Sequence, residues 1–239
     1  MKTLMASPSI RSRVPQPLRL VAIGDSLVYG YGDPQGGGWV ERLRRFGMDP
    51  AHPGPILYNL GVRGDGVQQV LKRMEQEFHL RGELRNRLPD GIILSVGVND
   101  SARLSHRHGK TFTSLPLFTQ TLQHLLDQAR QWGPVWFVGM VPVNEGKMPF
   151  LDCLYYNHQD QAIYNQAIQD ACAEREIPFL DLFHQWQQHG EPWCQRHLSA
   201  DGLHPNSTGY QAIQQAVMRW PALHSLWDYP TPSCTELAS

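Results

Sequence analysis

The chain has 239 residues, of which 41% are hydrophobic and 18% are charged, and its formal net charge is −1. This length and this apolar content suit one α/β domain with a single sizeable core. A net charge so close to zero argues against a general nucleic-acid partner, and no run approaches the 18 apolar residues that a membrane-spanning helix needs, so we expect no stable membrane insertion.

In chain order, residues 1–17 come first and are rich in Pro, Ser and Arg, a composition that residues 229–239 share. We expect both ends to be flexible and to flank a single domain at 18–228. The first segment carries positive charge without an apolar stretch, so it does not resemble a signal peptide. The four cysteines form no C-x-x-C pair, and we therefore expect reduced thiols and a cytoplasmic location.

Between these ends, short apolar segments alternate with segments of helical periodicity. The apolar segments predict five strands, at 18–23, 56–60, 91–96, 134–140 and 177–181. The periodic segments predict helices at 39–46, 66–80, 115–132, 155–175 and 207–220. Asp65 is the expected N-cap of the second of these helices, and Asn206 or Ser207 is the expected N-cap of the last.

Strands that are apolar throughout and separated by helices predict a parallel sheet covered by helices on both faces. Such sheets bind ligands at the carboxyl ends of their strands. Polar segments follow the first three predicted strands, and a fourth precedes the last helix. These segments are Gly24-Asp25-Ser26-Leu27, Asn59-Leu60-Gly61, Gly97-Val98-Asn99-Asp100 and Asp201-Gly202-Leu203-His204-Pro205.

Ser26, His204 and Asp201 have the side chains of a nucleophilic triad. A serine hydroxyl is a weak nucleophile unless a base lies beside it, and histidine is the usual base. Asp201 precedes His204 by three residues, so its carboxylate can fold back to the ring and leave the other ring nitrogen for Ser26. The backbone N–H groups of Ser26 and Gly61 and the side-chain amide of Asn99 are the candidate donors for an oxyanion hole.

The four ordered segments resemble the conserved blocks of the GDSL esterases and lipases, also called SGNH hydrolases, from Gly24 to Pro205. The resemblance implies a flavodoxin-like three-layer α/β/α sandwich around a five-stranded parallel sheet. It implies hydrolysis of an ester through an acyl-enzyme, with a triad of Ser26, Asp201 and His204 and with no metal or organic cofactor. It also implies an oxyanion hole made by Ser26, Gly61 and Asn99.

Further residues have two interpretations each. The Gly-rich stretch Gly30–Gly38 lacks the G-K-[ST] ending of a phosphate loop and is typical of a mobile lip. Tyr29 precedes this stretch and Tyr31 lies within it, and both can bind substrate by lining the acyl or alcohol pocket. Arg63 can touch substrate or pair with an Asp. Phe150, in the segment Asn144–Asn157, can contact substrate or pack under its loop.

Asp25 and Asp100 each stand beside a key residue, and we expect both to bind loop backbone, as Asp side chains in turns do. His106 and His108 are two residues apart without a third ligand nearby, which argues against a metal site.

The prediction is a serine hydrolase acting on a small-molecule ester, with a short acyl group such as acetyl on a small or carbohydrate alcohol. An acyltransferase that uses the same site, and a non-catalytic module that binds carbohydrate or lipid, are the alternatives. The sequence leaves the oligomeric state open.

Overall fold

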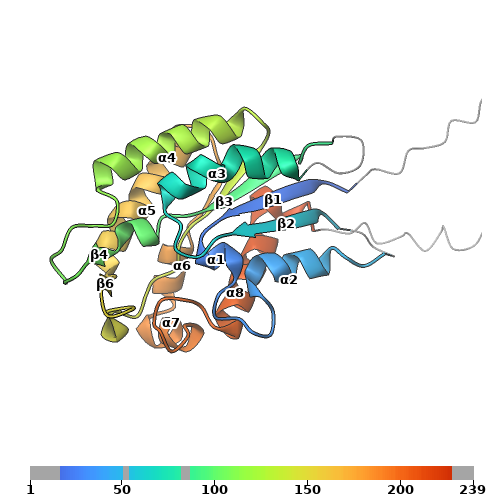
Figure 1. Cartoon of the computed structure of the whole chain (residues 1–239). Coiled ribbons are helices and arrows are strands. Elements are labelled where there is room, and N and C mark those ends of the chain that lie inside the picture. Colours follow the sequence, from blue (N-terminus) through green and yellow to red (C-terminus); the bar gives the residue numbers. More distant parts are fainter. Residues whose placement is uncertain (1–16, 51–53, 82–86, 228–239) are drawn as a thin grey trace, which may run out of the picture.

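The protein, in a computed structural model, is built around a five-stranded parallel sheet with the strand order β2-β1-β3-β5-β7 (Figure 1). The structure describes residues 17–50, 54–81 and 87–227, so the ends predicted to be flexible lie outside it except for residue 17. The strands of this sheet are β1 (Arg19–Gly24), β2 (Ile56–Gly61), β3 (Gly91–Ser95), β5 (Val135–Val138) and β7 (Phe179–Leu180). All five predicted strands are confirmed.

Helices cover both faces of the sheet, which confirms the three-layer prediction. Above the sheet in Figure 1 lie α3 (Val67–Leu80), α4 (Leu115–Arg130) and α5 (His158–Ala173). Below it lie α2 (Gly38–Phe46) and α8 (Ser207–Arg219). The shorter helices are α1 (Ser26–Tyr29), α6 (Leu182–Gln188), α7 (Glu191–His197) and α9 (Pro221–His224), with 3₁₀ turns η1 (Asn99–Ser101) and η2 (Glu145–Lys147).

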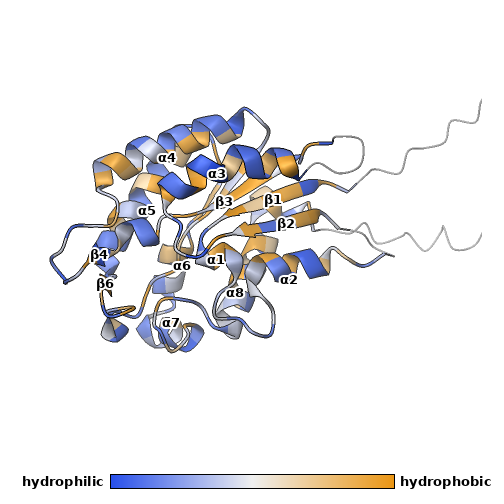
Figure 2. Ribbon diagram, viewed as in Figure 1, coloured by the Kyte–Doolittle hydropathy of each residue, from blue (hydrophilic) through white to orange (hydrophobic). Residues whose placement is uncertain are grey.

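Successive residues of β1 point to opposite faces of the sheet, as the pleat of a strand requires. Val21 and Ile23 pack into the core beneath α3, α4 and α5, whereas Leu20 and Ala22 pack into the core beneath α2 and α8. All four side chains are fully buried. Figure 2 shows the consequence: the strands are hydrophobic, and the helices are hydrophobic on one side and hydrophilic on the other. The two cores and the sheet between them hold the strand ends in fixed positions.

A small antiparallel sheet lies beside the main one and was not predicted. It pairs β4 (Arg103–Leu104) with β6 (Leu154–Tyr155), with Leu104 opposite Leu154. The helix predicted from residue 155 therefore begins only at His158, where Asn157 is the N-cap and accepts the N–H of Asp160. The prediction was wrong at this boundary because the residues before the cap pair with another strand.

The predicted N-cap of α3 was also wrong, whereas that of α8 was right. Gly66, not Asp65, precedes α3, and Gln69 Oε1 accepts the N–H of Gly66. The N–H of Val67, the first residue of α3, donates to the carboxylate of Asp100, which is far away in the sequence. Asn206 caps α8, one of the two residues expected to do so.

Candidate active site

Ser26 lies directly beyond the carboxyl end of β1, as the first residue of α1. Asp25 is the N-cap of that helix, and its Oδ1 accepts the N–H of Leu27 at 2.8 Å. Gly24 has to be a glycine, because a Cβ there would lie 1.9 Å from the carbonyl oxygen of Ser95 on β3. This close approach fixes where β1 ends, and with it the position of Ser26.

His204 and Asp201 lie in the turn between α7 and α8. Asp201 Oδ1 accepts the N–H groups of Leu203 and His204 at 2.9 and 3.0 Å, and Asp201 Oδ2 lies 2.8 Å from Nδ1 of His204. The other ring nitrogen, Nε2, lies 2.9 Å from Ser26 Oγ. A carboxylate can only accept, so Nδ1 carries the proton and Nε2 is free to accept from the hydroxyl.

Burial alone would raise the pKa of Asp201, but the hydrogen bonds from the ring and the N–H of His204 and from the N–H of Leu203 bring it below its ordinary value. Asp201 is therefore ionised at neutral pH. Ser26 and His204 are almost fully buried, at 4% and 3% exposed. The structure thus brings together the three residues predicted to form a triad.

Gly61 ends β2 beside Ser26. A Cβ at this position would lie 2.1 Å from the backbone nitrogen of Tyr29, so the helix after Ser26 packs directly on the glycine. The N–H of Gly61, a predicted oxyanion donor, is bonded to Asn59 Oδ1 at 3.0 Å. In this state the donor is occupied by a neighbouring side chain.

Asn99 begins η1, just after β3. Its Nδ2 donates to the carbonyl oxygen of Asp65 at 2.9 Å, and its Oδ1 accepts the hydroxyl of Tyr156 at 3.2 Å. Among the described residues no acceptor is found for the second hydrogen of Nδ2. The Asn99 amide therefore keeps one donor available at the carboxyl edge of the sheet.

Aromatic side chains border the His204 ring. The Tyr31 ring meets it edge-on with centroids 4.7 Å apart, and the Phe150 ring does so at 5.7 Å. The guanidinium carbon of Arg63 lies 3.7 Å from the centroid of the Tyr31 ring, a cation–π geometry. Tyr29 is 53% exposed, and its backbone N–H donates to the carbonyl oxygen of Asp25. Tyr31 and Phe150 are thus the aromatic side chains that meet the His204 ring.

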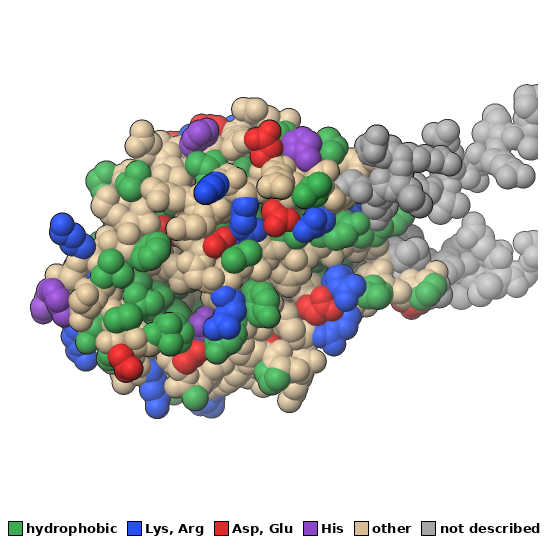
Figure 3. Space-filling model, in the orientation of Figure 1, with side chains coloured by type: hydrophobic (Ala, Val, Ile, Leu, Met, Phe, Trp, Pro, Cys, Tyr) green, Lys and Arg blue, Asp and Glu red, His purple; other side chains and the backbone are tan. Residues whose placement is uncertain are grey.

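On the face drawn in Figure 3, hydrophobic side chains gather over the region of β4 and β6, next to a hollow in which a histidine is visible. Leu104 of β4 is 37% exposed, and Leu151, just before β6, is 71% exposed. The residues of β4 and those just before β6 therefore contribute to an exposed apolar patch on this face of the molecule.

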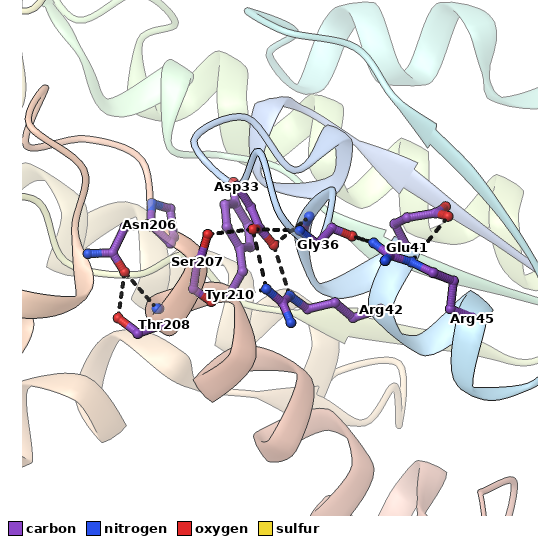
Figure 4. A network of polar contacts seen from close by, with 12 residues as sticks. Asp33, Gly36, Glu41, Arg42, Arg45, Asn206, Ser207, Thr208 and Tyr210 are labelled. Atoms are coloured by element: carbon purple, nitrogen blue, oxygen red, sulfur yellow. Dashed lines mark hydrogen bonds and ion pairs between the residues drawn. The ribbon is translucent and has the colours of Figure 1, made fainter.

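The Gly-rich stretch after α1 is fixed by a buried carboxylate (Figure 4). Asp33 accepts hydrogen bonds from Arg42 Nε at 2.8 Å, from the hydroxyl of Ser207 at 2.7 Å and from the N–H of Gly36 at 2.8 Å. Burial opposes ionisation, but these hydrogen bonds hold the pKa of Asp33 far below its ordinary value. The stretch predicted as a mobile lip is tied at Asp33 to α2 and to the start of α8.

Tyr210 and Gly32 join the same stretch to the residues around His204. The Tyr210 hydroxyl, drawn in Figure 4, donates to the carbonyl oxygen of Tyr31 at 2.9 Å. Gly32 has a φ of 100°, and a Cβ there would lie 2.5 Å from the carbonyl oxygen of Pro205. The turn that carries His204 and the stretch that carries Tyr31 therefore pack against each other without intervening side chains.

Arg73 of α3 connects the ends of two strands. It donates to the carbonyl oxygens of Gly24 and Leu60 at 2.8 and 2.9 Å, and it forms an ion pair with Asp65 at 2.7 Å. This arginine, rather than Arg63, is the partner of the nearby aspartate. One cation thus sets the spacing between the strands that end next to Ser26 and Gly61.

Asp25 and Asp100 bind backbone N–H groups, which confirms their predicted structural contacts. Burial raises the pKa of Asp25 to about 7, against the lowering effect of the Leu27 N–H. Burial also raises the pKa of Asp100, although the Thr113 hydroxyl and the Val67 N–H oppose it. The site therefore rests on two carboxyl groups that are difficult to ionise.

Within the described residues, no three His, Cys, Asp or Glu side chains are arranged to hold a metal ion. In the same part of the chain, no helix combines the length and the apolar character needed to cross a bilayer. Cys153, Cys172 and Cys194 are free thiols, and Cys234 lies outside the described residues.

The sequence did not single out Tyr156 or Asp33 as parts of the site. Tyr156 belongs to a segment for which loop packing and substrate contact were both considered, and Asp33 lies in the predicted lip. An Asp among five glycines and a Tyr followed by an Asn N-cap are common in loops, so neither is a specific signal. Their contacts depend on which loops the fold brings together.

Comparison with known proteins gives a family match and a fold match. The profile of the GDSL-like lipase/acylhydrolase family matches residues 22–212. A lipase/acylhydrolase from Enterococcus faecalis superimposes with a TM-score of 0.68 at 20% identity, covering 90% of this chain and 99% of that chain. A catalytic mutant of an acetylxylan esterase from Geobacillus stearothermophilus gives 0.65 at 15% identity, covering 91% and 99%. No curated protein sequence matches the chain.

Proposed function

Because the chain belongs to the GDSL-like lipase/acylhydrolase family and is a carboxylic ester hydrolase, we propose that it cleaves its ester through an acyl-enzyme on Ser26. The observation that carries this proposal is the continuous contact from Asp201 Oδ2 to His204 Nδ1 at 2.8 Å and from His204 Nε2 to Ser26 Oγ at 2.9 Å. A nucleophile, a base and a group that orients the base are the parts that acyl transfer requires.

In the first half-reaction Ser26 Oγ bonds to the ester carbonyl carbon while its proton passes to His204 Nε2. The ionised Asp201 stabilises the imidazolium through Nδ1 and keeps the ring oriented. The tetrahedral intermediate collapses, the bond to the alcohol oxygen breaks, and His204 gives the proton to that oxygen. In the second half-reaction a water molecule loses its proton to His204 and attacks the acyl-enzyme, which restores Ser26 and releases the acid.

The developing oxyanion is bound by the N–H groups of Ser26 and Gly61 and by Nδ2 of Asn99. Ser26 is the first residue of α1, so its N–H has no acceptor inside that helix. The N–H of Gly61 exchanges Asn59 Oδ1 for the oxyanion, a more strongly charged acceptor. The unshared hydrogen of Asn99 Nδ2 supports the third contact.

We place the substrate among esters of short acyl groups, such as acetyl, with small or carbohydrate alcohols. Tyr31 and Phe150 enclose His204. Arg63 lies over the Tyr31 ring and Tyr29 is exposed three residues after Ser26, so we propose both as further substrate contacts. A cavity of about 330 Å³ shares Tyr156 with the site, and its walls include Arg103, Arg107, Asn157 and Gln159. Hydrogen-bonding walls suit a hydroxylated group, and the fold is also that of an acetylxylan esterase.

Ser26→Ala tests this function on p-nitrophenyl acetate. The variant has no nucleophile, so we expect turnover to fall by at least about a thousandfold, while the unfolding midpoint stays close to that of the unchanged protein. A fluorophosphonate probe should label the unchanged protein and fail to label the variant. Ser225→Ala, at an exposed position after α9, is the matched control and should keep full turnover. Unchanged hydrolysis in Ser26→Ala would rule the proposal out.

A further inference from the structure

Two hydrogen bonds hold the Asn99 amide at its opposite ends. Nδ2 donates to the carbonyl oxygen of Asp65 at 2.9 Å, and Oδ1 accepts the phenol O–H of Tyr156 at 3.2 Å. A carbonyl oxygen can only accept, so the contact with Asp65 identifies which end of the amide carries the hydrogens. The remaining Nδ2 hydrogen then has a defined direction.

Tyr156 reaches Asn99 from a separate segment, 57 residues further along the chain. It lies between β6 and α5, its side chain is 2% exposed, and it packs in the core beneath α3, α4 and α5. Burial holds the pKa of the Tyr156 phenol well above its ordinary value, so the group stays protonated across the working pH range. It is therefore a permanent donor on a rigid support.

We propose that Tyr156 is a positioning residue for the oxyanion hole, which fixes the Asn99 amide through Oδ1 so that its free N–H faces the ester oxygen. The inference rests on the proposed function, because it assigns a task to Tyr156 only if Asn99 binds the oxyanion. Asn99 is half-buried at the start of a three-residue 3₁₀ turn, so its backbone alone does not fix the side-chain torsions.

The hydrogen bond from Tyr156 also makes Asn99 Nδ2 a stronger donor. A hydrogen bond accepted by Oδ1 polarises the amide and makes the N–H at the other end a better donor, because hydrogen bonds in a chain reinforce one another. This effect is largest where the acceptor is charged, as it is in the tetrahedral intermediate. Loss of the phenol oxygen should therefore weaken binding of the transition state more than binding of the substrate.

Tyr156→Phe removes one oxygen atom and keeps the ring. On p-nitrophenyl acetate we expect kcat, per site titrated with fluorophosphonate, to fall about tenfold, with KM changed by less than about twofold. Inhibition by methylboronic acid, which forms a tetrahedral adduct on serine, should weaken about tenfold. A purely structural role would lower the unfolding midpoint without moving either quantity.

Tyr164→Phe is the matched control. Tyr164 is buried to the same 2%, and its hydroxyl donates to the carbonyl oxygen of Thr113 rather than to Asn99. We expect kcat and boronate inhibition of this variant to stay within about twofold of the unchanged protein, even where its unfolding midpoint falls. Equal losses of kcat in the two Phe variants would overturn the proposal.

Asn99→Ala completes a double-mutant cycle. Alone it should lower kcat about a hundredfold, and Tyr156→Phe should then lower kcat further by less than about twofold, because the amide it positions is gone. A tenfold loss from Tyr156→Phe in both backgrounds would overturn the inference and leave the proposed function intact. If Asn99→Ala left kcat unchanged, the proposed oxyanion hole would be wrong at Asn99, and the inference would fail with it.

Discussion

At the scale of single residues, the most unusual group is the buried carboxyl of Asp25. Oδ1 accepts the Leu27 N–H, whereas Oδ2 has no hydrogen-bond partner within the described chain. Burial raises its pKa from 3.8 to about 7, so the folded protein binds a proton there that the unfolded chain has already lost. The contribution of Asp25 to the free energy of unfolding is therefore complete below about pH 4 and is lost as pH rises through 7.

Asp25→Asn should remove this pH dependence. The amide oxygen can still accept the Leu27 N–H, but no charge forms in the buried site. Relative to the unchanged protein, the free energy of unfolding of the variant should rise by about 2–4 kcal/mol between pH 4 and pH 8. Urea denaturation at both pH values measures it. An equal difference at the two pH values would show that Asp25 ionises normally.

The residue scale also shows where prediction from sequence stops. The order of Ser26, Asp201 and His204 and the turns that hold them were sufficient to predict that the three would meet. The pairing of Tyr156 with Asn99 could not be predicted, because it depends on the packing of segments that are far apart in sequence. The bond from Gly61 to Asn59 was missed for another reason: the residues are close in sequence, but the side-chain torsion of Asn59 is set by its surroundings.

At the scale of elements, Asp33 joins three parts of the molecule: the stretch after α1, helix α2 and the start of α8. The Asp33 side chain is fully buried, and the side chain of its partner Arg42 is 20% exposed. The pKa of Asp33 is far below its ordinary value, so its contribution to stability is complete above about pH 4 and is lost as pH falls below that.

Asp33→Asn should destabilise the protein by about 2 kcal/mol at pH 7, because it leaves Arg42 without a charged partner in a largely buried site, and the difference should shrink near pH 3. Asp127→Asn is the control. Asp127 pairs with Arg175, but its side chain is 55% exposed, and such pairs are worth less than about 1 kcal/mol. Equal effects of the two substitutions would contradict a special role for Asp33. Thermal and urea unfolding measure both.

The elements themselves were predictable to different degrees. Continuous apolar segments identified the five strands of the main sheet, which is covered on both faces, and helical periodicity identified the long helices, whose buried faces repeat about every 3.6 residues. The short helices α1, α6, α7 and α9 were missed, because one or two turns give too few repeats. The start of α5 was misplaced for a different reason, since β6 is defined by its partner β4 and not by its own two residues.

At the scale of the whole molecule, the opening to the site is made by segments from across the chain. Tyr31 follows α1, Arg63 follows β2 and Phe150 precedes β6. The rings of Tyr31 and Phe150 meet the His204 ring, and Arg63 lies over the Tyr31 ring. The parallel sheet predicted from sequence brings these loops to one edge, which is why the location of the site could be predicted and the shape of its opening could not.

Hydrolysis of a series of p-nitrophenyl esters of increasing acyl-chain length tests the shape of the opening. With Tyr31 and Phe150 packed on either side of His204, we expect kcat/KM to fall steeply once the acyl chain exceeds about four carbons, since each methylene that does not fit costs at least about 1 kcal/mol. Phe150→Ala should shift the optimum to longer chains, and Leu80→Ala, at an exposed position at the end of α3, should leave it unchanged. A rate that rises steadily to ten carbons would contradict the short acyl group.

The contact between Tyr156 and Asn99 also bears on how this enzyme can be redesigned. We expect that the part from Leu151 to Tyr155 can be replaced to change which esters are accepted, because within the described chain no hydrogen bond or ring contact of Ser26, Gly61, Asn99 or His204 involves it. Phe150 has to stay, because its ring meets that of His204. A graft that extends one residue further loses the phenol and with it the partner of Asn99 Oδ1. Selectivity and turnover are thus separable from Leu151 to Tyr155, and a library of grafted loops should keep Phe150 at its N-terminal junction and the Tyr156 phenol at its C-terminal junction.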